Sequence, residues 1–155
     1  MTIQFKLTDR AISLQETKGF VFTPSRSTSG SAGYDLCACI DEDRVFYPDE
    51  VALIGTGIHI HIKDRTLVGL LFARSSTKGL MLANSVGVID SDYLGEIKCK
   101  YRNVTGESLT LKAGEKFAQL LVVPCYIDNF KLLTKEDFDT NYSTRGTGGF
   151  GSTGE

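Results

Sequence analysis

The stretch 145–155 holds the densest group of side chains suited to binding a phosphorylated ligand. It contains five glycines together with Arg145, Phe150 and Ser152. A guanidinium pairs with phosphate, an aromatic face stacks on a base, and a hydroxyl donates a hydrogen bond. A glycine-rich segment with so few apolar residues cannot pack on itself, so it is either an idle end or a segment that orders over a ligand. We favour the second interpretation because the three groups lie so close together.

A second candidate is the segment 73–79, Ala-Arg-Ser-Ser-Thr-Lys-Gly, which follows an apolar run. It places two cations, several hydroxyls and backbone N–H groups where we expect a short helical turn to begin, over Ser75–Lys78. A helix start of this kind suits phosphate oxygens. An ordinary strand-to-turn junction with a serine cap explains the same residues, so spacing alone leaves both interpretations open.

The third candidate is the segment 87–96, which has glycines at 87 and 95 and Asp-Ser-Asp between them. Aspartate and serine form turns, so a β-hairpin or a bulged turn is expected here. Asp90 follows the apolar pair Val88 and Ile89, which predicts that its carboxylate points inward, where it could hold a water for attack on phosphorus. Its ordinary pKa of about 3.9 leaves it ionised at neutral pH. Asp90 and Asp92 could instead be a paired metal site, which would require a third oxygen ligand.

Other polar residues stand among apolar ones. Asp35 opens a predicted strand and Gln119 lies within another, and either could be satisfied by backbone partners. His59 and His61 alternate and could begin a metal site, but no third ligand is apparent, and a half-buried strand explains them as well. The four cysteines lack C-x-x-C spacing, so we expect buried, reduced thiols.

These candidates need a scaffold, and the sequence predicts an all-β one. Short apolar or alternating runs recur between turn formers, and no window of about eleven residues shows a helical stripe. We expect one domain over 1–140, a barrel or sandwich with helix confined to a turn or two, and a flexible glycine-rich tail over 141–155. The predicted strands are Ile3–Leu7, Gly19–Phe22, Tyr34–Cys39, Val51–Ile54, Ile58–Ile62, Leu67–Phe72, Glu96–Tyr101, Ser108–Leu111 and Phe117–Val123.

Composition limits the partners and the location. The 155 residues are 41% hydrophobic, enough for one domain with a core, and the net charge of −2 offers no basic footprint for nucleic acid. No apolar run approaches the roughly 18 residues of a membrane span, and the first residues lack a signal-peptide core. We therefore expect a cytoplasmic protein with a small ligand, no nucleic-acid partner and no membrane contact.

Taken in order, five segments resemble the five motifs of the homotrimeric dUTP diphosphatase (dUTPase) family. They are AGYDL, ARSS, GVIDSDYLGE, GEKFAQLLVVP and RGTGGFGSTG, spread from Ala32 to Gly154. The resemblance implies a distorted β-barrel of the β-clip type and a homotrimer with active sites at its subunit interfaces. It also implies hydrolysis of dUTP to dUMP and pyrophosphate with Mg²⁺, which limits uracil incorporation into DNA and supplies dUMP for thymidylate synthesis.

The resemblance assigns roles residue by residue. Asp90 corresponds to the general base that orients a water against the α-phosphorus, and Tyr93 to the ring that packs on deoxyribose. Asp35 corresponds to an acid that supports the water shell of the metal or a neighbouring arginine. The uracil-reading positions are Asn84, Gly87, Val88, Ile89 and Lys98. The phosphate-binding positions are Arg74, Ser75, Ser76 and Gln119, and those of the closing tail are Arg145, Phe150, Gly151 and Ser152.

One departure from the family pattern and two alternative functions stand beside this assignment. The segment 75–83 is shorter than in many members, and Ser76 stands where glycine is common, which bears on the phosphate contacts. A dCTP deaminase of the same superfamily is the nearest alternative, but the IDSDYLGE segment and the glycine-rich tail favour the diphosphatase. The other alternative is a nucleotide-gated binding protein, in which ordering of the tail presents a surface to a partner.

Overall fold

The computed structural model describes residues 3–139 and residue 143. The helices there are α1 (Asp9–Lys18) and α2 (Lys135–Asp139), and the strands are β1 (Gln4–Leu7), β2 (Tyr34–Cys37), β3 (Arg44–Phe46), β4 (Val51–His61), β5 (Leu67–Ala73), β6 (Leu80–Leu82), β7 (Gly87–Ile89), β8 (Glu96–Asn103), β9 (Leu109–Leu111) and β10 (Lys116–Pro124).

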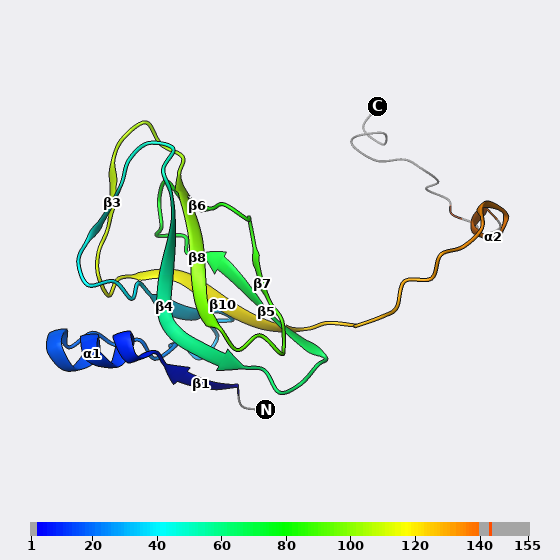
Figure 1. The fold of residues 1–155 in the computed structure, drawn as a ribbon, viewed down its shortest axis with the longest axis horizontal. Coiled ribbons are helices and arrows are strands. Elements are labelled where there is room, and N and C mark those ends of the chain that lie inside the picture. The colour runs from blue at the N-terminus through cyan, green and yellow to red at the C-terminus, as the bar shows by residue number, and fades with distance from the viewer. Residues whose placement is uncertain (1–2, 140–142, 144–155) are drawn as a thin grey trace.

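The strands form two four-stranded antiparallel sheets, in the orders β1-β4-β8-β6 and β2-β10-β5-β7, and a separate β3-β9 pair (Figure 1). The all-β prediction is confirmed. Within the described residues both sheets remain open at their edges, so the expected distorted barrel is a two-sheet arrangement without closure. β3, β6 and β7, of three residues each, were missing from the predicted set, whereas the equally short β9 lies within the predicted strand Ser108–Leu111.

The central strand β8 builds the core by alternation. Ile97, Cys99 and Tyr101 are buried, and the lysines between them face outward. The Tyr101 hydroxyl donates to the Phe117 carbonyl at 2.7 Å and so ties the first sheet to the second. Burial raises the pKa of the Cys99 thiol to about 12. All four cysteines are free and three are buried, as predicted, while Cys125 is half-buried.

The ten-residue helix α1 is a correction, because helix was expected only as a turn or two. Its buried face consists of just Ala11 and Leu14, too few apolar positions to make a stripe that the sequence reveals. Its end signals were present, however. The Thr8 hydroxyl accepts from the Ala11 N–H at the start, and Gly19 ends the helix with a φ of 70°.

The segment 19–22, predicted as a strand, contains none. Phe22 is apolar for a different reason: it is buried with Leu14 and Cys39 in a small core beneath the helix. Side-chain packing, not strand pairing, therefore explains the apolar residues here.

β4 is one strand where two were predicted, and it carries a bulge. Its pairing with β8 breaks between Gly55, opposite Lys98, and His59, opposite Glu96, so three residues of β4 stand opposite Ile97 alone. Gly57, inside the bulge, has a φ of 73°, which favours glycine. The strand bends; it pairs with β8 mainly before the bulge and again at His59, and it pairs with β1 only from Ile58 onward (Figure 1).

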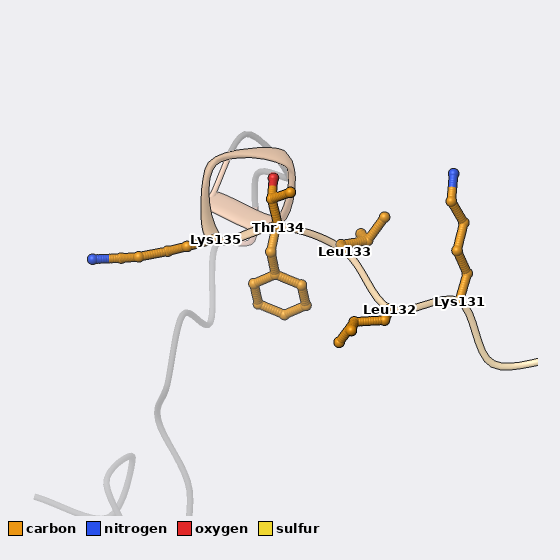
Figure 2. A pocket seen from close by; sticks show the side chains of 6 residues that line it. Lys131, Leu132, Leu133, Thr134 and Lys135 are labelled. Atoms are coloured by element: carbon orange, nitrogen blue, oxygen red, sulfur yellow. The ribbon is translucent and has the colours of Figure 1, made fainter.

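The segment after β10 leaves the two sheets and runs out to α2 (Figure 1). Its Tyr126, Phe130 and Leu132 are more than nine-tenths exposed. The neighbouring Leu133 is just over a third exposed. Figure 2 shows Leu132 and Leu133 along this segment, between Lys131 and Lys135, where it forms a hollow of about 430 Å³. No predicted site residue lines that hollow. Within the described residues, no helix is both long and apolar enough to span a membrane.

Replacing Gly57 by alanine is expected to lower the free energy of unfolding by about 2 kcal/mol or more, because a side chain at positive φ is strained. The added carbon would also lie 2.7 Å from the Ala11 Cβ and 2.8 Å from the Cys39 Sγ. Urea denaturation measures the change. Gly106→Ala is the control, since nothing lies within 4 Å of a carbon added there; equal effects of the two substitutions would contradict the interpretation.

Candidate functional site

A pocket of about 350 Å³ lies at the edge of the second sheet, where β2, the end of β5 and β10 meet. The antiparallel register places Asp35 of β2 opposite Gln119 of β10, and Gln119 opposite Phe72 of β5. The pocket is lined by Ser27, Ser31, Ala32, Gly33, Asp35, Arg74, Ser75, Gln119 and Leu121. Four residues predicted from the sequence therefore converge on one pocket.

Asp35 is the charged centre of this pocket, and its carboxylate is buried. Arg74 Nε donates to Oδ1 at 2.8 Å, and Lys116 Nζ donates to Oδ2 at 3.1 Å. The Ser27 hydroxyl also donates to Oδ2, at 3.3 Å. Burial by itself would raise the pKa of Asp35, but the hydrogen bond from Lys116 and the charge of Arg74 outweigh it and hold that pKa below its ordinary value.

Arg74 is fixed as well as charged. Its Nη1 donates to the Ser76 hydroxyl at 3.0 Å and to the Lys116 carbonyl at 3.1 Å. Its side chain is about a quarter exposed. The guanidinium is thus held at the pocket by three partners, which is the preorganisation that recognition of an anion requires.

Gln119 enters the pocket through the space that Gly33 leaves. Its Nε2 donates to the Ala73 carbonyl at 3.1 Å. A carbon added at Gly33 would lie 2.6 Å from the Gln119 Oε1, so glycine is required for this approach. The amide oxygen therefore faces Gly33 on the pocket wall.

The short helix expected over Ser75–Lys78 is absent, which is a correction. The segment makes tight turns, with the Thr77 N–H donating to the Arg74 carbonyl at 3.0 Å and the Lys78 N–H to the Ser76 carbonyl at 2.9 Å. The Thr77 hydroxyl donates to the Phe117 carbonyl at 2.9 Å, which fastens the turn to β10. Phosphate contacts here cannot rest on a helix N-terminus.

A second group of predicted residues lies on the link between β7 and β8, residues 90–95. A turn is present, as predicted, and the Tyr93 N–H donates to the Asp90 carbonyl at 3.1 Å. It is not a hairpin, because β7 pairs with β5 and β8 with β4 and β6, in different sheets. Asp90 was expected to point inward but is exposed, because it occupies the turn that carries the chain between the sheets. Tyr93 is 44% exposed.

The predicted base-reading residues border this link. Gly87 and Ile89 are buried in β7, and Val88 between them is exposed. A carbon added at Gly87 would lie 3.0 Å from the Leu71 Cβ, so glycine lets β7 approach β5. Asn84 is exposed in the turn before β7, and Lys98 is exposed on β8.

The single chain does not bring the two groups of predicted residues into one pocket. Of the described residues that line the pocket at Asp35, none belongs to the link. Arg145, Phe150, Gly151 and Ser152 lie outside the described residues. Lys116 was not predicted as a site residue, because regular alternation places residues 116 and 119 on opposite faces of a strand. The register of β10 with β2 shifts between Lys116 and Ala118, and Lys116 contacts Asp35.

The described residues contain no group of three His, Cys, Asp or Glu side chains arranged to hold a metal ion. Both carboxylate oxygens of Asp35 are already engaged by cations, so this residue does not fit a direct metal ligand. Its hydrogen bond from Arg74 is compatible with the indirect role expected from the sequence, in which the acid supports a neighbouring arginine.

Comparison with known proteins identifies the family of this open two-sheet β protein, which has a cationic pocket at a sheet edge. A profile of the dUTPase family matches residues 21–154. The deoxyuridine 5'-triphosphate nucleotidohydrolase of Hahella chejuensis is 44% identical over 134 residues, which cover 84% of this chain and 86% of that protein. The protein of the same name from Neisseria meningitidis is also 44% identical, with 84% and 87% covered. The chain therefore belongs to the dUTPase family.

Solved structures agree with this assignment. A Staphylococcus bacteriophage 80alpha dUTPase with dUPNHPP superimposes with a TM-score of 0.81 at 27% identity and covers 99% of both chains. The dUTPase of Streptococcus mutans gives a TM-score of 0.65 at 33% identity, covering 81% of this chain and 98% of that one. The family prediction is confirmed.

Asp35→Asn is expected to lower the free energy of unfolding at neutral pH by about 1–3 kcal/mol, because the amide carries no charge for the two cations. The stabilisation from the carboxylate is complete above its ordinary pKa of about 3.9 and is lost as the pH falls through the lowered pKa of the folded state. Denaturant titrations at neutral pH and below that value check this, with the exposed Asp128→Asn as control. A gap between wild type and Asp35→Asn that does not narrow in acid would contradict it.

Proposed function

We propose that the chain hydrolyses dUTP to dUMP and pyrophosphate, in a site completed by a second copy of the chain. The observation that carries the proposal is the preorganised Asp35–Arg74–Lys116 cluster at a pocket in a member of the dUTPase family. Relatives named for nucleotidohydrolysis of deoxyuridine 5'-triphosphate, and a related structure holding dUPNHPP, support this substrate.

Asp90 is the proposed general base. An exposed carboxylate in a turn is accessible to water and to a nucleotide, and the link gives it a fixed backbone position through the Tyr93 N–H. A carboxylate in this position can act as a general base and accept a proton from the water that attacks the α-phosphorus. The Tyr93 ring, nearly half exposed, would pack on deoxyribose, where a 2′-hydroxyl of ribose would meet it.

The pocket at Asp35 is the proposed phosphate end of the site. Arg74 faces it with its guanidinium held in place, and Ser75, Ser76 and Gln119 supply further hydrogen-bonding groups. Mg²⁺, when bound by phosphate oxygens and water, would offset charge on the triphosphate. The uracil end would be formed by Asn84, Gly87, Val88, Ile89 and Lys98.

Two features support association of copies with shared active sites, and the family resemblance implies that the number of copies is three. The predicted residues fall into two groups that one chain does not unite in a pocket. In addition, Tyr126, Phe130 and Leu132 expose large apolar side chains on a segment that leaves the sheets, and such surface is typical of an interface. The residues 1–140 would form the subunit, and 141–155 the tail that closes over the nucleotide and excludes water. The enzyme would act in the cytoplasm, limiting uracil incorporation and supplying dUMP.

Pyrophosphate release from dUTP tests the proposal, with dCTP, dTTP and UTP in parallel, with and without Mg²⁺. Selective release from dUTP is expected. Ammonia release from dCTP would favour a deaminase instead. Binding of dUTP without turnover would favour a nucleotide-gated binding protein.

Asp90→Asn is expected to lower kcat for dUTP by about 10² to 10⁴-fold while leaving nucleotide binding largely intact, because the amide cannot accept the proton. Steady-state kinetics and calorimetric titration with a non-hydrolysable dUTP analogue separate the two quantities. Asp92→Asn, two residues along the same link, is the matched control. Turnover at the wild-type rate in Asp90→Asn would rule out the mechanism.

Deletion of residues 145–155 is expected to remove catalysis and leave the folded assembly in place, because the described residues supply the core and the tail supplies closure. Pyrophosphate release and sedimentation equilibrium report the two properties. A truncated protein with wild-type turnover would show that the tail is idle.

A further inference from the structure

The start of β8 is fastened to the bulge of β4 by a side chain. Glu96 Oε1 accepts from the Gly57 N–H at 3.0 Å, and Glu96 Oε2 lies 3.4 Å from Lys98 Nζ. The carboxylate lies over Gly55, where an added carbon would stand 2.3 Å from Oε1. Because Gly55 has no side chain, it leaves the space that this carboxylate occupies.

His59, the residue after the bulge, fastens the link itself. Its Nδ1 lies 2.9 Å from the Leu94 carbonyl oxygen. A carbonyl only accepts, so Nδ1 carries the hydrogen. The Tyr93 hydroxyl in turn donates to the Glu96 carbonyl at 3.0 Å. Hydrogen bonds near the bulge therefore hold three residues in this part of the chain: Tyr93, Leu94 and Glu96.

The bulge also has hydrogen bonds that do not involve the Glu96 side chain. The Thr56 hydroxyl, which is buried, donates to the Ile97 carbonyl at 2.7 Å, and the Gly57 carbonyl accepts from the Thr8 N–H at 2.9 Å. These bonds hold β4 against β8 and against the end of β1. Glu96 and His59 add contacts that position the link, residues 90–95, relative to these strands.

We propose that Glu96 and His59 are positioning residues that fix the Tyr93 ring and thereby set the preference for deoxyribose over ribose. The inference rests on the proposed function, in which this ring lies against the sugar. Discrimination against the 2′-hydroxyl of ribose requires a rigid contact surface. The Tyr93 hydroxyl donates to the carbonyl of Glu96, and the Glu96 side chain is bonded to Gly57 in the bulge. A misplacement of about 1 Å is enough to cost about 10²-fold in catalysis.

Glu96→Ala, Glu96→Gln and Gly55→Ala test the Glu96 contact through the ratio of kcat/KM for dUTP to that for UTP. Glu96→Ala and Gly55→Ala are expected to lower the ratio by about 10-fold or more, the second because its added carbon displaces the carboxylate. Glu96→Gln keeps an oxygen for the Gly57 N–H and is expected to retain most of the ratio. In the Glu96→Ala background, Gly55→Ala is expected to have no further effect.

His59→Asn and His59→Leu form a second pair. Asparagine keeps an N–H near the position of Nδ1 and is expected to preserve the ratio, while leucine is expected to lower it. His61→Leu, on the same strand face and exposed, is the matched control. Because these variants keep the Glu96 side chain and its bond to Gly57, they test the proposal even if a Glu96 variant fails to fold, which circular dichroism would reveal.

The outcomes distinguish a failure of the proposed function from a failure of the positioning role. Wild-type protein that releases no pyrophosphate from dUTP contradicts the proposed function and is seen before any variant is made. Variants that lose rates on dUTP and UTP equally, with an unchanged ratio, overturn the positioning role and leave a structural one. A lowered ratio in Glu96→Ala and His59→Leu, restored in Glu96→Gln and His59→Asn, supports it.

Discussion

The pocket end of the second sheet depends on the neutralisation of one buried carboxylate. Asp35 faces two cations and a hydroxyl that arrive from three places: the end of β5, the start of β10 and the loop before β2. Removing any one cation would leave a charge with less compensation in a buried position. The same bonds orient Arg74, so the interaction that holds these elements together also aims the guanidinium at the pocket.

The molecule separates a fixed pocket from an exposed link, and the bulge of β4 connects the link to the scaffold. The bulge lets one strand pair with β8 over its first half and with β1 over its second, which turns the first sheet. It also leaves the Gly57 N–H without a strand partner of its own and so available to Glu96. A feature that shapes the sheet therefore also supplies an anchor for the residues proposed to face the sugar.

Sequence patterns predicted what depends on local alternation and missed what depends on tertiary contact. The long strands β5, β8 and β10 were found because their buried residues alternate or form a continuous run. The helix α1 was missed because it buries only two residues, and its caps carried the readable signal. Asp35 and Gln119 could be identified as polar groups among apolar ones, but the contact of Lys116 with Asp35 depends on register. Asp90 is exposed because its turn connects strands of two different sheets, and the sequence of no single segment predicts that arrangement.

In the proposed homotrimer, the exposed apolar segment after β10 would link folding to mass action. Tyr126, Phe130 and Leu132 are exposed in the isolated chain, so an interface that covers them would contribute stability only when copies meet. Stability gained in this way would grow with protein concentration, because association would involve the folded chain and not the unfolded one. The melting temperature would then be a property of the solution as much as of the sequence, and dilution alone would weaken the fold.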